Sequence, residues 1–192
     1  MIKLTFKSYL SLGILAELII LIFFYLISEN LGDIFRMSAR YSGRLSLIIY
    51  LICFYHFTFS FIKRKSKTEL NQSVIVFCVL HYIHFIYLAL SVYLNDLPII
   101  PSKLAGGFIA YLMILVYPFI INKIIKPVFH FIYFYYVGIV MGITYLERIR
   151  GNFEGAEPDL FHYIGISSVI ISLIGFGLYL MKNRRLINNW YA

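Results

Sequence analysis

The 192-residue chain is 61% hydrophobic and only 14% charged, with a mean hydropathy of +0.82, which excludes an ordinary water-soluble domain. Its net charge of +8 does not indicate nucleic-acid binding, because the lysines and arginines fall mainly in polar breaks between apolar runs, where they meet anionic lipid head groups. These apolar runs are about 20 residues long, enough for a helix to cross a bilayer. We therefore expect an all-α polytopic membrane protein, a six-transmembrane-helix bundle that forms a single domain over residues 1–192.

The six membrane-spanning helices are predicted at about 8–27, 43–62, 72–94, 103–121, 127–146 and 163–181. Residues 28–42 are expected to form a loop or a short interfacial helix. Pro98 ends the third helix because proline lacks an amide donor, and Pro127 suits the first turn of the fifth. Gly138 and Gly142, four residues apart in the fifth helix, would let another helix approach closely.

The distribution of basic residues predicts how the chain is oriented. Eleven lysines and arginines flank the side of the membrane that holds both termini, whereas six flank the other side. Cytoplasmic loops of helical membrane proteins carry the excess of Lys and Arg. We therefore expect a protein of the cell (inner) membrane that is surrounded by membrane lipid and has both termini in the cytoplasm.

One carboxylate and four histidines fall inside the predicted spans, where each is costly unless it is paired or ligated. Their depths follow from the distance to the cytoplasmic end of each helix at about 1.5 Å per residue. They are about 6 Å for His130, about 9 Å for His56, about 13 Å for Glu17 and His81, and about 18 Å for His84. These five residues are the candidate functional site.

The histidines have two interpretations. Two histidines at similar depth on different helices can ligate a haem iron from opposite faces, which makes His81, His84, His130 and His56 candidate haem ligands. The other interpretation is hydrogen bonding between helices. Glu17 is either an acceptor that orients a ligating histidine, part of a proton or metal site with His56 and His81, or a structural hydrogen-bond partner.

Four segments carry a family resemblance. They are residues 42–47 (SGRLSL), 84–88 (HFIYL), 107–115 (GFIAYLMIL) and 128–133 (VFHFIY). In this order they resemble the ferric-reductase-like transmembrane domain, and within that family the haem-binding membrane subunit of the bacterial methionine sulfoxide reductase system. The resemblance begins at residue 42 and covers about two thirds of the chain.

The resemblance implies a six-helix bundle that binds haem b between the helices at 72–94 and 127–146 and passes electrons to iron, a quinone-linked chain or a protein partner. By position, His84 or His81 matches the family's ligand on the first of these helices, and His130 matches the first ligand on the second. The family usually has another histidine further along, where this chain has Ile143 and Thr144. The resemblance therefore implies at most one haem, or a relative that binds none.

One leading hypothesis and two alternatives follow. The leading hypothesis is a membrane b-type cytochrome subunit of ferric-reductase type with at most one bis-histidine haem. Because the sequence has no Gly-x-Gly-x-x-Gly motif, its electrons would come from a separate redox partner protein or from quinol, and any role in an oxidoreductase depends on the resemblance. The alternatives are a haem-free proton-coupled or small-solute transporter that uses Glu17 and the intramembrane histidines, and a membrane scaffold or interaction subunit.

Overall fold

The computed structural model describes residues 6–63, 67–124, 126–152 and 158–183, which form six α-helices and no strand. The helices are α1 Phe6–Ile27, α2 Leu31–Lys63, α3 Lys67–Leu94, α4 Pro101–Ile120, α5 Pro127–Ile149 and α6 Leu160–Lys182. The predicted all-α membrane bundle is confirmed. With the exception of the start of α2, every helix begins and ends within five residues of its predicted bounds.

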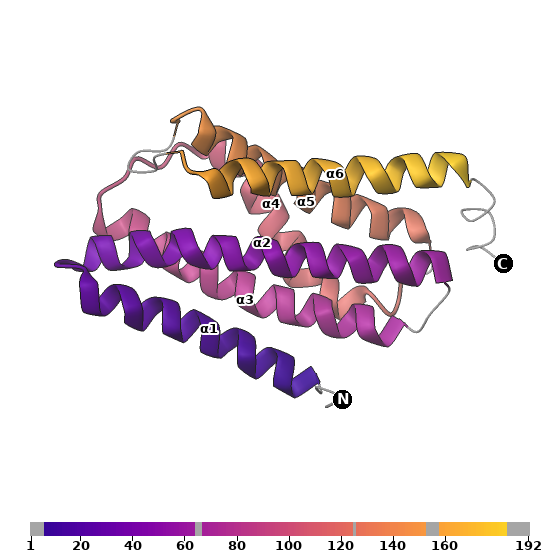
Figure 1. Cartoon of the computed structure of the whole chain (residues 1–192), viewed down its shortest axis with the longest axis horizontal. Helices are drawn as coiled ribbons and strands as arrows, with labels where there is room; N and C mark the ends of the chain where they lie inside the picture. The colour runs from indigo at the N-terminus through magenta and orange to yellow at the C-terminus, as the bar shows by residue number, and fades with distance from the viewer. Residues whose placement is uncertain (1–5, 64–66, 125, 153–157, 184–192) are drawn as a thin grey trace.

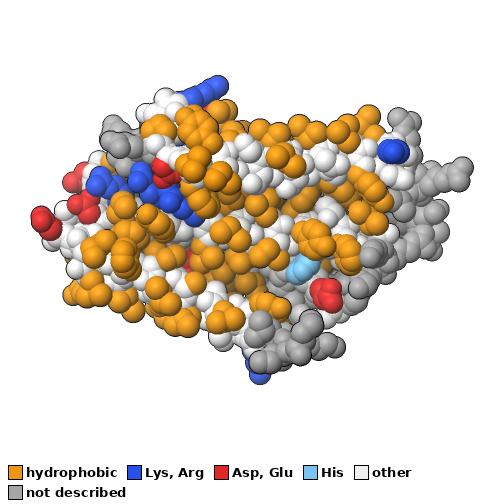
Figure 2. Space-filling view, in the orientation of Figure 1, with side chains coloured by type: hydrophobic (Ala, Val, Ile, Leu, Met, Phe, Trp, Pro, Cys, Tyr) orange, Lys and Arg blue, Asp and Glu red, His pale blue; other side chains and the backbone are white. Residues whose placement is uncertain are grey.

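The described helices have the lengths and surfaces of membrane-spanning segments. α1, α2, α3, α5 and α6 are long and apolar enough to cross a bilayer, while α4 has a shorter apolar stretch, Leu104–Ile120. Large hydrophobic side chains are exposed along every helix. In Figure 2 such side chains cover the middle of the face in view, and charged side chains lie mainly toward its ends. An exposed apolar surface of this extent is expected to face lipid.

Apart from α4, which crosses the view obliquely, the helices run roughly along the long axis of the molecule (Figure 1). α1, α3 and α5 begin at the end of the bundle where α2, α4 and α6 end, and we call this the terminal end. α2 packs most extensively against α3, and α5 packs against both α4 and α6. α1 packs mainly on α2 and α3 and so forms one side of the bundle.

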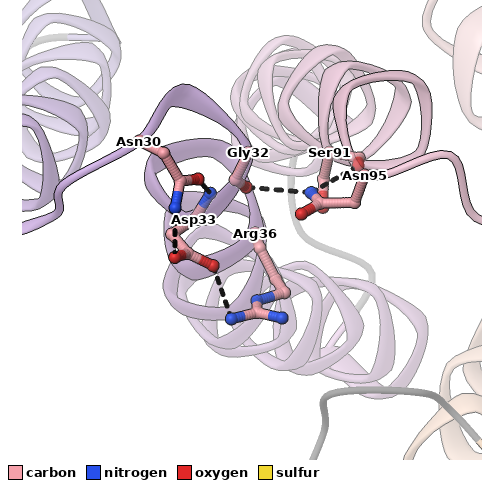
Figure 3. A network of polar contacts seen from close by, with 6 residues as sticks. All are labelled: Asn30, Gly32, Asp33, Arg36, Ser91 and Asn95. Carbon is pink, nitrogen blue, oxygen red and sulfur yellow. Dashed lines mark hydrogen bonds and ion pairs between the residues drawn. The ribbon is translucent and has the colours of Figure 1, made fainter.

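The prediction that α2 begins near Gly43 was wrong, because residues 31–42 form its first turns. Asn30 caps the helix, since its Oδ1 accepts a hydrogen bond from the Asp33 amide and its Nδ2 donates to the Asp33 carboxylate, both at 2.8 Å (Figure 3). Arg36 pairs with the same carboxylate at 2.5 Å. A helix of 33 residues is about 50 Å long, so its first turns can carry charges beyond the hydrocarbon core.

Asn95, which directly follows α3, links the end of that helix to the start of α2. Its Nδ2 donates to the carbonyl oxygens of Gly32 at 3.0 Å and Ser91 at 2.8 Å (Figure 3). A Cβ on residue 32 would lie 2.7 Å from Asn95 Oδ1, so the contact depends on glycine. This contact fixes α3 against α2 at the end opposite the terminal end.

Aromatic side chains fill the interior between α2, α4, α5 and α6. Phe57 stacks on Phe134 with ring centroids 4.5 Å apart, and Tyr117 stacks on Tyr133 at 3.6 Å. Phe176 of α6 contacts Phe57 edge to face at 5.7 Å. This aromatic core is tightly packed and lies toward the terminal end, whereas most of the buried polar groups lie further from that end.

Candidate functional site

Five polar side chains from three helices are buried near one another, and we call them the polar cluster: Glu17 of α1, Ser42 and Ser46 of α2, and His81 and His84 of α3. Glu17 is 1% exposed, His81 7% and His84 8%. Ionisable groups buried inside a membrane bundle are costly and usually have a role. The polar cluster is therefore the candidate functional site.

A face of small residues on α2 makes room for this cluster. Ser38, Ser42 and Ser46 recur every four residues, so they lie on one side of the helix, and all three are fully buried. Beside them, a Cβ on Gly43 would lie 3.0 Å from Cε1 of His84. Small residues let helix backbones approach closely, so both α1 and α3 can bring ionisable side chains up to α2.

The Glu17 carboxyl group is hydrogen-bonded on one oxygen. The Ser42 hydroxyl donates to Oε1 at 2.8 Å, and the Tyr87 hydroxyl donates to the Glu17 backbone carbonyl at 3.3 Å. Oε2 is buried and has no hydrogen-bond partner in the part of the chain that the structure describes. Because an ionised oxygen without a donor is strongly disfavoured in such a place, Oε2 is a suitable position for a proton.

His81 and His84 lie on one face of α3 with their ring centroids 5.5 Å apart. Nδ1 of His81 shares a hydrogen bond with the Ser46 hydroxyl at 2.5 Å, and its ring stacks on Tyr111 of α4 at 4.7 Å. Nδ1 of His84 is buried and lacks a hydrogen-bond partner within the described ranges. With Glu17, the two rings place three proton-binding groups around one segment of α2.

His130 and His56 lie elsewhere in the bundle. Nδ1 of His130 shares a hydrogen bond with the Tyr117 hydroxyl at 2.5 Å, and its ring centroid is 6.4 Å from that of Phe57. His56 is half-buried on α2, one residue before Phe57. The structure thus brings Glu17, His81 and His84 to one region and keeps the other two predicted site histidines apart from them.

This separation bears on the predicted haem. His81 is level with Ser46 of α2, whereas His130 is level with Phe57, eleven residues further along the same helix. At about 1.5 Å per residue the two histidines are about 16 Å apart along the bundle. Two axial ligands must approach one iron from opposite faces, so the arrangement does not fit a haem shared between α3 and α5.

His56 and His130 are a second possible pair of haem ligands, and the space between them is already filled. The interior at their height is occupied by the stacked rings of the aromatic core. Among the described residues no ring contact joins His56 to His130, and no group of three or more His, Cys, Asp or Glu could hold a metal ion. The geometry thus does not favour a haem there, and haem binding stays a prediction from the sequence.

A second polar group lies at the start of α6, where it meets the same stretch of α2 that contacts the polar cluster. Asp159 and His162 form a capping box on α6, in which the Asp159 carboxylate accepts from the His162 amide at 3.3 Å and His162 Nδ1 accepts from the Asp159 amide at 3.0 Å. The same carboxylate pairs with Arg44 of α2. Desolvation raises the pKa of Asp159, but the Arg44 charge and the cap outweigh it and hold the pKa below its ordinary value.

Removing this carboxylate is expected to destabilise the bundle in two steps. D159N keeps the cap, since asparagine caps helices as well as aspartate, and loses about 1 kcal/mol or less from the partly exposed ion pair. D159A also loses the cap, at about 1 kcal/mol more. Because the pKa of Asp159 is lower in the folded protein than in the unfolded chain, the stability that the Asp159 carboxylate contributes is lost as the pH falls through the folded-state pKa. The stability of D159N lacks this dependence on pH. Denaturant unfolding at several pH values measures both effects, and equal stabilities of the three proteins would contradict the assignment.

Sequence reasoning missed the hydroxyl partners of the histidines. Ser46 could have been found, because the four-residue spacing of Ser38, Ser42 and Ser46 marks a helix face suited to close packing. Tyr117 gives no such signal, since tyrosine is frequent throughout this chain. Its pairing with His130 depends on how α4 and α5 are rotated about their axes.

No family model, curated protein or solved structure matches this chain. The ferric-reductase-like resemblance stays a prediction.

Proposed function

We propose that this chain is a haem-free, proton-coupled membrane transporter in which Glu17, His81 and His84 bind and release the coupled protons. The observation that carries the proposal is the convergence of these three titratable side chains, from two helices, on the small-residue face of α2. Buried ionisable side chains of this kind are typical of proton relays in transporters.

Neighbouring positions of α2 connect the three groups. Ser42 contacts Glu17, and the next residue, Gly43, is packed against His84. His81 contacts Ser46, one turn further along. Glu17, His84 and His81 therefore contact α2 within one stretch of five residues, 42–46.

α1 is the helix best placed to respond to protonation. Glu17 and Phe24 are its buried residues, while most of its large side chains face outward. A buried ionised carboxylate without a paired charge is strongly disfavoured. Loss of the Glu17 proton should therefore weaken the docking of α1 on α2, which couples proton release to a movement of α1.

The proposed orientation places the terminal end in the cytoplasm, with the protein in the cell (inner) membrane. The excess of lysines and arginines on the side of both termini supports this orientation by the positive-inside rule. Protons would then enter from the end opposite the terminal end when transport is driven by an inward gradient.

Sealed proteoliposomes test the proposal. A proton gradient is imposed across the vesicle membrane in the presence of a mixture of small solutes, and the retained solutes are identified by mass spectrometry. We expect at least one solute to accumulate with the gradient and the accumulation to disappear when a protonophore is added. The proposal fails if every retained solute is insensitive to the gradient.

The visible spectrum of the same preparation separates this proposal from the cytochrome hypothesis. After expression with ample haem, the reduced-minus-oxidised spectrum is expected to show no b-type signal. A sharp b-type signal near one haem per chain that disappears in H130A would overturn the haem-free assignment and restore the electron-transfer hypothesis.

A further inference from the structure

An apolar groove runs between α4 and α5 on the outside of the bundle, and we call it the α4–α5 groove. Its volume is about 490 Å³, and its lining includes Leu112, Val116 and Ile120 of α4 and Phe129 and Ile132 of α5. All five side chains are exposed. In a membrane bundle, an open apolar groove of this kind faces the acyl chains of the bilayer.

The floor of the groove is formed by the aromatic rings of two tyrosines. Tyr117 and Tyr133 line it and stack on each other at 3.6 Å. The Tyr117 hydroxyl is turned to His130 in the interior, and the Tyr133 side chain is almost fully buried. The groove therefore offers apolar contact along its length and few polar groups to a ligand.

Two basic residues stand at one end of the groove. Lys123 and Lys126 are exposed in the connection between α4 and α5, next to the lining residue Ile124. From Ile120 the lining continues for eight residues to Leu112, about 12 Å along α4. The groove thus combines positive charge at the terminal end with an apolar channel that runs toward the middle of the bilayer.

We propose that the α4–α5 groove binds one anionic glycerophospholipid, with an acyl chain in the groove and the phosphate at Lys123 and Lys126. The charge complementarity and the position of the charges favour this occupant, because the head group of a lipid lies at the membrane interface and its chain points inward.

The head-group half of this site is tested by paired charge changes at the terminal end. K123Q/K126Q removes the two lysines of the site, and K7Q/K182Q removes the same charge from exposed positions on α1 and α6. Native mass spectrometry measures binding of phosphatidylglycerol and of zwitterionic phosphatidylcholine to each purified protein. We expect the wild type and K7Q/K182Q to prefer phosphatidylglycerol, and K123Q/K126Q to bind it about fivefold more weakly per lysine removed. Equal binding by the two double variants would overturn the proposal.

The chain half of the site is tested by filling the groove. V116W and I132W each place a large side chain in it, whereas I109W adds a similar bulk on an exposed part of α4 outside the lining. We expect loss of the tightly bound lipid in V116W and I132W and its retention in I109W, with all three proteins monodisperse. Retained lipid in both groove variants would also overturn the proposal. The site lies apart from the polar cluster, so either result leaves the transport proposal to its own test.

Discussion

The change E17Q is expected to abolish proton-driven accumulation in proteoliposomes while the bundle remains folded. The glutamine amide oxygen can still accept the hydrogen bond that the Ser42 hydroxyl donates to Oε1. The variant cannot bind or release a proton at this position, so docking of α1 on α2 no longer depends on the proton gradient. Solute accumulation, measured with the wild type as reference, should fall to the level of vesicles without protein.

E29Q is the matched control for this prediction. Glu29 lies in the connection between α1 and α2 and is exposed, so the same change of side chain leaves the polar cluster intact. E29Q should transport at the wild-type rate. Wild-type transport by E17Q would show that Glu17 carries no coupled proton, and equal losses in both variants would point to an unspecific effect on α1.

The change G138A is expected to destabilise the bundle by about 2 kcal/mol or more. An added Cβ would clash with the Tyr50 hydroxyl oxygen, and Tyr50 is fully buried. That hydroxyl donates to the Phe134 carbonyl at 2.7 Å, a bond that joins α2 to α5. Overpacking costs about 1–3 kcal/mol, and a broken hydrogen bond that leaves buried groups unsatisfied costs about 1–3 kcal/mol more.

G142A is the control, because a Cβ at that position would meet Val169 at an ordinary contact distance of 3.6 Å. Its free energy of unfolding should stay within about 1 kcal/mol of the wild type, since alanine favours the helix over glycine. Unfolding in denaturant from the same detergent measures both variants. Similar losses in G138A and G142A would contradict the role assigned to the Tyr50 contact.

Much of the fold could be predicted because runs of apolar residues report directly on membrane-spanning length. The start of α2 could not be predicted in this way. Asp33, Arg36 and Arg40 lower the hydropathy of residues 31–42, and a prediction based on hydropathy alone assigns such a segment to a loop. Helix continuity depends instead on capping, and the Asn30 side chain supplies the cap. The close approach predicted for the fifth helix involves a tyrosine hydroxyl at Gly138 and only ordinary contact at Gly142.

The candidate site could be predicted residue by residue but not as an assembly. The position of Glu17 in an apolar run and the spacing of His81 and His84 marked them as buried polar groups. Their partners depend on the rotation of each helix about its axis, which these patterns do not fix. For the same reason the sequence left open whether a histidine of α3 meets His130. In the structure His81 is level with Ser46 of α2 and His130 is level with Phe57, so the two histidines lie far apart along the bundle.

The measurement that tests the central claim most directly is the infrared difference spectrum of the protein in lipid between acidic and alkaline buffer. If Glu17 binds and releases a proton between α1 and α2, the wild type and E29Q show the carbonyl band of a protonated carboxyl group that disappears at alkaline pH. E17Q lacks this band when the acidic buffer is kept at about pH 6, where carboxyl groups of ordinary pKa are already ionised. A difference spectrum of E17Q identical to that of the wild type would contradict the claim that Glu17 is the proton-binding carboxyl group of this bundle.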